Sequence, residues 1–199
     1  NLKMIERIRE SRCEAHKTEE QALLREAELL HALRPPYNIV GTDPEPYFFI
    51  ATRSEPRPQG SLFHFQLTAQ ESIDGYKVFG CYKHRRRVKS GYGALLRIIF
   101  AAQNSKRRFS FPARITRSSP PYVYSSLFPE AWIEDLHRFL EGRNRALLRK
   151  IMQSLLENEC VPPFMYGPIQ DDLNRVLQFY RFGPRATRSL AIRSGSRYH

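Results

Sequence analysis

Residues 18–38, TEEQALLREAELLHALRPPYN, form the stretch that most constrains how this chain folds. At about 100° per residue, a helix from Thr18 has one broad apolar stripe, formed by Ala22, Leu23, Ala27, Leu30 and Leu33. Glu26 lies near the middle of that stripe, where a carboxylate needs an ion pair, hydrogen bonds or a metal ion, because desolvating it alone is costly. The alternative is that Glu26 reaches solvent or a neighbouring arginine from the edge of the stripe. Thr18 is the expected N-cap, and Pro35-Pro36 is expected to end the helix.

The charge of the chain favours a polyanionic partner. Lysine and arginine number 32 against 20 acidic residues, a net charge of +12. Nucleic acid is the first candidate, with a membrane surface or simple solubility as the alternatives. No apolar run is long enough to span a bilayer, so no membrane partner is expected. The three cysteines (Cys13, Cys81 and Cys160) are too widely spaced for a disulfide framework or a zinc cluster, which favours the cytoplasm. The chain begins with asparagine rather than methionine, which is typical of a piece of a longer protein.

The middle of the chain predicts a small antiparallel sheet. Residues 47–52, 62–68 and 76–82 are rich in aromatic and β-branched side chains, and turn signals with Pro, Gly and Asp separate them. Within residues 62–68, Phe63, Phe65 and Leu67 alternate with polar side chains, as in a half-buried strand.

The second half of the chain predicts helices. We expect an apolar helix over 92–102 and a last one over 169–182, with a long helical pattern over 129–159 between them. In that pattern Gly142 is either a bend or a tolerated helical glycine. The prediction is therefore an α+β chain in five parts. These are residues 1–45, a β/α region 46–110, an irregular connector 111–128, a helical region 129–185 and a basic tail 186–199.

Two basic clusters flank the helix predicted after the third strand. They are candidate phosphate contacts, and the alternative is an ordinary solvated surface. The first cluster is Lys83, Arg85, Arg86, Arg87 and Lys89, and the second is Lys106, Arg107 and Arg108.

Common catalytic motifs are missing from the sequence. It has no glycine-rich phosphate loop, no GxSxG elbow and no HExxH helix, and its six histidines have no metal-ligand spacing. From the residues alone the prediction is a basic α+β protein that binds nucleic acid.

A resemblance extends this prediction. The segment MIERIRESRCEAHKTEEQALLREAELLHALRPPYN resembles the C-terminal half of a GIY-YIG nuclease domain, in particular that of the UvrC family of bacterial nucleotide excision repair. QALLREAELLHALRPPYN is in register with the family pattern E-A-L-L-L-E-x-x-L-I-K-x-x-x-P-x-Y-N. The likeness continues through NIVGTDPEPYFFIAT and YKVFGCYKHRRRVKSGYGALLRIIF, with a weaker echo in HRFLEGRNRALLRKIMQSL.

The resemblance implies a DNA endonuclease and assigns residues to it. Glu26 matches the metal-binding glutamate of the family, and Asn38 matches the asparagine that closes the nuclease core. One Mg²⁺ or Mn²⁺ ion is implied, and a single carboxylate suits it because Mg²⁺ keeps several waters and takes substrate phosphate as a further ligand. DNA is the implied substrate, with UvrA- or UvrB-like proteins as implied partners.

The chain also departs from the family pattern. The hairpin that carries the GIY and YIG triplets is expected upstream of Asn1, so no residue is assigned as a catalytic tyrosine. The cysteine cluster of many UvrC proteins is missing, so no iron–sulfur centre is expected. CVPPFMYGP stands where the family carries a helix that binds UvrB, which weakens the expectation of a UvrB partner. Two alternatives remain, namely a non-catalytic nucleic-acid-binding relative and a structural or ribosome-associated basic protein.

Overall fold

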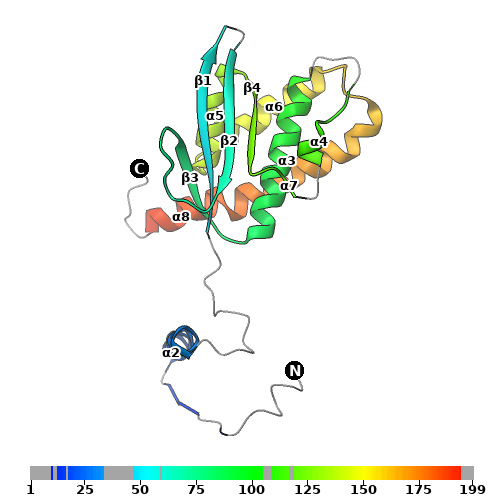
Figure 1. Ribbon diagram of the computed structural model, residues 1–199. Coiled ribbons are helices and arrows are strands. Elements are labelled where there is room, and N and C mark those ends of the chain that lie inside the picture. Colours follow the sequence, from blue (N-terminus) through cyan, green and yellow to red (C-terminus); the bar gives the residue numbers. More distant parts are fainter. Residues whose placement is uncertain are drawn as a thin grey trace. The chain divides into compact units, whose positions relative to one another are not determined.

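The structure is a computed structural model, and its chain forms two compact units, Asn1–Glu45 and Pro46–His199, each described by itself (Figure 1). The residues that it describes are 10, 13–16, 18–33, 47–58, 60–104, 109–116 and 119–193.

The N-terminal unit contains helix α2, Glu19–Leu33. The predicted N-cap is confirmed, because the hydroxyl oxygen of Thr18 accepts a hydrogen bond of 3.3 Å from the backbone N–H of Gln21. The described side chains on this helix are mainly exposed, and Leu33 is 70% exposed. The apolar stripe predicted from the sequence is therefore not buried at its C-terminal end.

The C-terminal unit is built on a four-stranded antiparallel sheet with the order β3-β1-β2-β4. The strands are β1 (Phe48–Arg57), β2 (Gly60–Thr68), β3 (Lys77–Tyr82) and β4 (Val123–Phe128). β2 and β3 match the predicted strands closely, and the alternating burial along β2 confirms the half-buried pattern. β1 begins as predicted but runs on through residues 53–57, where a turn was expected. Together with the helices, this sheet confirms the α+β class.

The fourth strand corrects one prediction. Residues 111–128 were expected to be an irregular connector, but they contain the short helix α4 (Ala113–Thr116) and then β4. β4 is an edge strand in which only Phe128 is fully buried, while Val123 and Leu127 are about half exposed. An edge strand needs few apolar residues, and therefore its sequence signal is weak.

Helices follow the sheet strands and pack against the sheet. They are α3 (Arg85–Gln103), α5 (Glu130–Leu140), α6 (Ala146–Glu157), a 3₁₀ turn η1 (Pro163–Met165), α7 (Tyr166–Phe182) and α8 (Pro184–Arg193). In Figure 1, α5 is seen behind β1 and β2, and α3 lies beside both α7 and α6.

Three helix boundaries differ from the predictions. α3 begins at Arg85 rather than near residue 92, so the first basic cluster is part of the helix. The pattern over 129–159 is two helices, because Gly142 has the left-handed φ of 70° and turns the chain after α5. α8 covers most of the predicted tail as far as Arg193.

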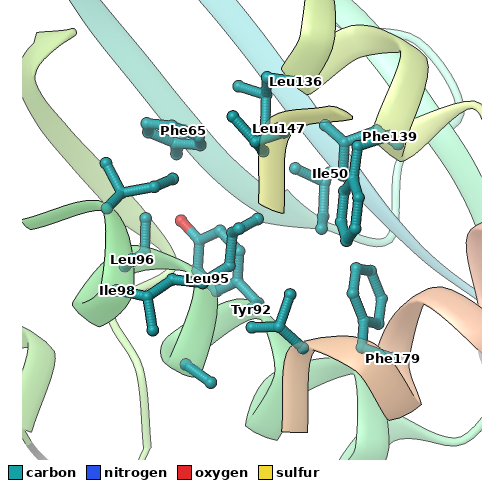
Figure 2. Packing of buried hydrophobic residues seen from close by; sticks show 14 of the residues in the cluster. Ile50, Phe65, Tyr92, Leu95, Leu96, Ile98, Leu136, Phe139, Leu147 and Phe179 are labelled. Carbon is teal, nitrogen blue, oxygen red and sulfur yellow. The ribbon is translucent and has the colours of Figure 1, made fainter. Parts of the chain in front are cut away.

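One continuous hydrophobic core joins the sheet to the helices. Figure 2 shows Ile50 and Phe65 from the sheet meeting Leu95 of α3, Phe139 of α5 and Phe179 of α7. Where α3 meets α7, a Cβ atom on Gly91 would overlap the side chain of Phe179, so glycine sets the close approach of these helices. Among the described helices, none is both long and apolar enough to cross a membrane.

Candidate nucleic-acid interface

The first basic cluster occupies the junction between β3 and α3. β3 ends at Tyr82, the chain turns through His84 with the left-handed φ of 68°, and α3 starts at Arg85. Lys83 and the three consecutive arginines Arg85–Arg87 are exposed. Val88 is buried in the core and anchors the helix, which leaves the arginines to fan out around its first turn.

This junction concentrates positive side chains at the N-terminus of α3, where they repel the partial positive charge of the helix. The first turn of α3 contains no acidic residue, and a helix N-terminus carries partial positive charge of its own. No described carboxylate forms an ion pair with Lys83, Arg85, Arg86, Arg87 or Lys89. A bound anion would relieve this repulsion, and the backbone N–H groups of a helix start add to the attraction.

Exposed aromatic rings lie beneath three of these cations. Lys83 Nζ lies 5.6 Å from the ring centroid of Tyr47, and the Arg87 guanidinium carbon lies 5.0 Å from that of Phe182. Both rings are substantially exposed, at 41% for Tyr47 and 56% for Phe182. Basic side chains interleaved with exposed rings are typical of surfaces that take phosphates and stacked bases together.

Tyr122 forms the third such pair and holds two cations of the cluster. Lys89 Nζ lies 4.7 Å from its ring centroid and donates a hydrogen bond of 2.7 Å to its hydroxyl oxygen. Hydrogen bonds from Lys89 and then Arg85 lower the pKa of the exposed Tyr122 phenol. The side chain therefore fixes Lys89 and Arg85 in place on the surface.

A pocket of about 750 Å³ opens beside the cluster, with Arg86 and Lys89 among its lining residues. Its wall includes the buried pair of Arg97 and Asp172, in which Arg97 Nε and Nη2 donate hydrogen bonds of 2.7 and 2.8 Å to the carboxylate. Arg175 donates a further bond of 2.9 Å to Asp172. Because this carboxylate is already engaged by two arginines, Arg86 and Lys89 supply the unpaired positive charge at this pocket.

Glu26, the candidate metal ligand, is exposed on α2. Its neighbour Arg25 pairs instead with Glu14, at 2.8 Å, and with Glu28, at 3.2 Å. No cation in the described part of the chain pairs with the Glu26 carboxylate, so its oxygens are accessible to a hydrated ion. No group of three or more potential ligands gathers among the described His, Cys, Asp and Glu residues. A single exposed carboxylate is compatible with an ion whose other ligands are water and substrate, and the described residues offer no site with several protein ligands.

Some predicted site residues lie outside the described part of the chain, and other residues escaped prediction. Asn38 and the second basic cluster, Lys106, Arg107 and Arg108, are outside the described residues. The three aromatic partners of the first cluster, Tyr47, Tyr122 and Phe182, were not predicted from the sequence. They come from segments distant in sequence, so only the exposed aromatic content could have suggested them.

The comparisons with known proteins point to one family. The chain is 29% identical to the UvrABC system protein C of Hahella chejuensis, over 76% of this chain and 26% of that protein. It is 26% identical to the protein of the same name from Pseudomonas fluorescens, with 77% and 26% covered, and 30% identical to that of Syntrophus aciditrophicus, with 76% and 25% covered.

The chain thus spans about a quarter of the length of the curated relatives that it matches. No protein-family model matches it, and no solved structure matches it significantly. The expected resemblance is nevertheless confirmed by several relatives of one name that cover three quarters of this chain. The chain is therefore UvrC-like, at 26–30% identity over the quarter of these relatives that it spans.

Proposed function

We propose that this chain is the DNA-contacting part of a nucleotide-excision-repair endonuclease, and that the β3–α3 junction holds the phosphate backbone of the DNA. The observation that carries the proposal is the junction cluster, Lys83, Arg85–Arg87 and Lys89, with its exposed aromatic partners. Its cations lie close together in the chain and have no carboxylate partner among the described residues, whereas Arg53 and Arg57 pair with Glu55.

Salt dependence of binding tests this surface directly. Each phosphate contact contributes about 0.9 to the slope of the logarithm of the affinity against the logarithm of the salt concentration. Replacing Arg85, Arg86 and Arg87 by glutamine should therefore flatten the slope for duplex DNA by about 2 to 3.

The matched control removes three exposed arginines elsewhere in the same unit, namely Arg114, Arg181 and Arg193. We expect this variant to keep the wild-type slope within about 1. An unchanged slope in the junction variant, or an equal loss in the control, would reduce the cluster to solvated surface.

The catalytic part of the proposal assigns one divalent ion, Mg²⁺ or Mn²⁺, to the Glu26 carboxylate. When bound, the ion neutralises charge that develops on the scissile phosphate and its leaving group. Glu26 itself contributes an exposed carboxylate from α2 that has no ion-pair partner among the described residues. Asn38 is proposed to close the same nuclease core, as the resemblance implies.

Nicking of damaged duplex DNA in the presence of Mg²⁺ tests this assignment. Glu26→Gln should slow cleavage about 100-fold or more, since the metal is worth several kcal/mol in the transition state. Glu28→Gln, on the same exposed helix, is the matched control and should leave cleavage within about 3-fold. Cleavage that is unaffected by Glu26→Gln would remove Glu26 from the metal site.

A second candidate is a relative that binds nucleic acid without cleaving it, and it is favoured by the same junction cluster. The two assays separate the candidates. Salt-dependent binding without any Mg²⁺-dependent nicking by the wild-type protein would support the binding relative.

Partner proteins are proposed only at the level of the family, as UvrA- or UvrB-like repair proteins. The segment CVPPFMYGP, where the family carries its UvrB-binding helix, folds into η1 and the start of α7. Phe164 and Tyr166 are exposed there, at 75% and 60%. Pull-down of purified UvrB by wild-type protein but not by a Phe164→Ser variant would assign this segment to the contact.

A further inference from the structure

A second strongly basic site lies away from the β3–α3 junction, in a pocket of about 710 Å³ between α6 and α7. Positions 145, 148, 149 and 152 line it from the N-terminal half of α6, and positions 170, 173, 177 and 180 line it from α7. These spacings place each set on one face of its helix. Arg185 of α8 joins the lining, and Gly142, just before α6, abuts Pro184, just after α7.

Gly142 is the reason why these segments converge. Its φ of 70° turns the chain after α5, and a Cβ atom there would overlap the carbonyl group of Pro184 at the start of α8. Only glycine therefore allows the turn between α5 and α6 to abut the turn between α7 and α8. This contact brings Arg143 and Arg145 to the same pocket as Arg185.

The arginines of this pocket are mostly uncompensated. Four of them line it, and Arg143 is the one that pairs, with Glu141 at 2.6 Å. Arg145, Arg149 and Arg185 have no carboxylate partner among the described residues, and no acidic residue belongs to the described lining. Three guanidinium groups around one hollow repel one another, and a bound anion reverses that cost.

The floor of the same pocket is apolar. Leu148 is buried and Leu173 and Leu177 are half-buried. Tyr180 is 6% exposed, and its ring packs at a tilt against that of Phe139, with centroids 5.0 Å apart. A pocket of several hundred cubic ångströms with an apolar floor and a few convergent polar groups is the usual form of a small-molecule site.

We propose that this arginine pocket, Arg143, Arg145, Arg149 and Arg185 over the floor of Leu148, Leu173, Leu177 and Tyr180, binds a nucleotide. The guanidinium groups take the phosphate, because their planar donor forks match phosphate oxygens in pairs. The floor takes the nucleoside, and Asn144 and Gln170 at the rim offer amide groups to it. The site is separate from the β3–α3 junction and stands whether or not that junction binds DNA.

Isothermal titration of the whole chain with adenosine monophosphate tests the pocket. We expect saturable binding, with affinity for inorganic phosphate at least about 10-fold weaker and no measurable binding of adenosine. Arg145→Gln and Arg149→Gln should each weaken the nucleotide about 10-fold or more, since a hydrogen bond to a charged group is lost.

The matched control is Arg181→Gln, an equal loss of charge at an exposed position of α7 that does not line the pocket. It should bind the nucleotide within about 2-fold of wild type. All three variants alter exposed side chains, so their unfolding midpoints should equal that of wild type and exclude misfolding as a cause.

Absence of nucleotide binding, or equal weakening by Arg181→Gln and Arg149→Gln, would overturn the proposal. Equal affinity for inorganic phosphate and the nucleotide would overturn the assignment of the floor. Binding of polyglutamate that is weakened by Arg145→Gln and Arg149→Gln, with no binding of the nucleotide, would replace it with an acidic protein partner.

Two sources of the nucleotide are distinguished by competition. An oligonucleotide with a 5′-phosphate that displaces the bound nucleotide, while its 5′-hydroxyl counterpart does not, would place a strand end in the pocket. Nucleotide binding that neither oligonucleotide disturbs would assign the pocket to a free nucleotide. Both results support the pocket itself, because both depend on Arg145 and Arg149.

Discussion

Replacing Asp172 by asparagine should destabilise the C-terminal unit strongly. The Asp172 side chain is 5% exposed and that of Arg97 is 17% exposed, so removing the carboxylate leaves a largely buried guanidinium without its counter-charge. Breaking a buried ion pair in this way costs about 3–5 kcal/mol. The lower end applies here, because Arg175 is half exposed and can turn to water, and because Arg97 keeps its hydrogen bond of 2.9 Å to the Ile115 carbonyl oxygen.

Urea unfolding monitored by tryptophan fluorescence is a suitable assay. Trp132, the single tryptophan, lies in α5 with its ring 6.1 Å from that of Phe128, and therefore reports on the core of this unit. With a urea dependence of about 2 kcal/mol per molar, a loss of 3 kcal/mol lowers the midpoint by about 1.5 M.

The control removes both partners of the pair. Arg97→Met with Asp172→Leu roughly keeps the volume and leaves no buried unpaired charge, because Arg175, which also loses its partner, is half exposed and can turn to water. Its unfolding free energy should lie within about 2 kcal/mol of wild type, the unpaired Ile115 carbonyl being the remaining cost. A loss below about 1 kcal/mol in Asp172→Asn, or a double variant less stable than the single one, would refute the reasoning.

Three further predictions concern the core and its edge. Gly91→Ala should lower the unfolding free energy by about 1–3 kcal/mol in calorimetry, because the methyl group overlaps Phe179, whereas an open helical glycine would gain stability. Tyr92→Phe should raise the unfolding free energy measured in urea by up to about 1 kcal/mol, since the buried hydroxyl has no hydrogen-bond partner among the described residues. A lower unfolding free energy would mean that the hydroxyl does have a partner. Burial, and then the charge of Lys77, lowers the pKa of His137, so the unfolded chain binds a proton more readily than the folded one. The contribution of His137 to stability is therefore full above about pH 6.5 and lost as the pH falls. In the His137→Gln variant the urea midpoint should therefore depend less on pH between about pH 7 and pH 5 than it does in wild type.

The parts of the fold that were predicted correctly have strong local signals. The alternation of Phe63, Phe65 and Leu67 is enough to define β2, and a threonine before an acidic first turn is enough to start α2. β4 was missed because its pairing with β2, rather than its own side chains, holds it in the sheet. The early start of α3 was missed because three arginines give no apolar period, although Val88 behind them is buried.

The candidate sites divide along the same line. The junction cluster was predicted because its cations are consecutive in the sequence, and Glu26 was singled out by its position on an apolar stripe. The exposure of Glu26 on α2 agrees with the alternative stated for it, a side chain that reaches solvent from the edge of the stripe. The aromatic partners of the junction and the arginine pocket could not be predicted, because they unite residues that only the folded chain brings together.

The net charge of +12 is easier to interpret when cations in ion pairs are separated from those without a carboxylate partner. Many cations are neutralised locally, as Arg53 and Arg57 are by Glu55 and as Arg97 is by Asp172. Of the described arginines that form no ion pair, Arg85, Arg86 and Arg87 lie at the β3–α3 junction and Arg145, Arg149 and Arg185 line the arginine pocket, while Arg114, Arg181, Arg188 and Arg193 lie at neither place. Each of the two places follows a tight turn with a left-handed residue. Solubility alone would spread unpaired charge evenly over the surface, whereas two concentrations with aromatic or apolar neighbours favour two anionic ligands. Because the junction variant changes a salt slope and the pocket variants change a nucleotide affinity, the two sites can fail or succeed independently.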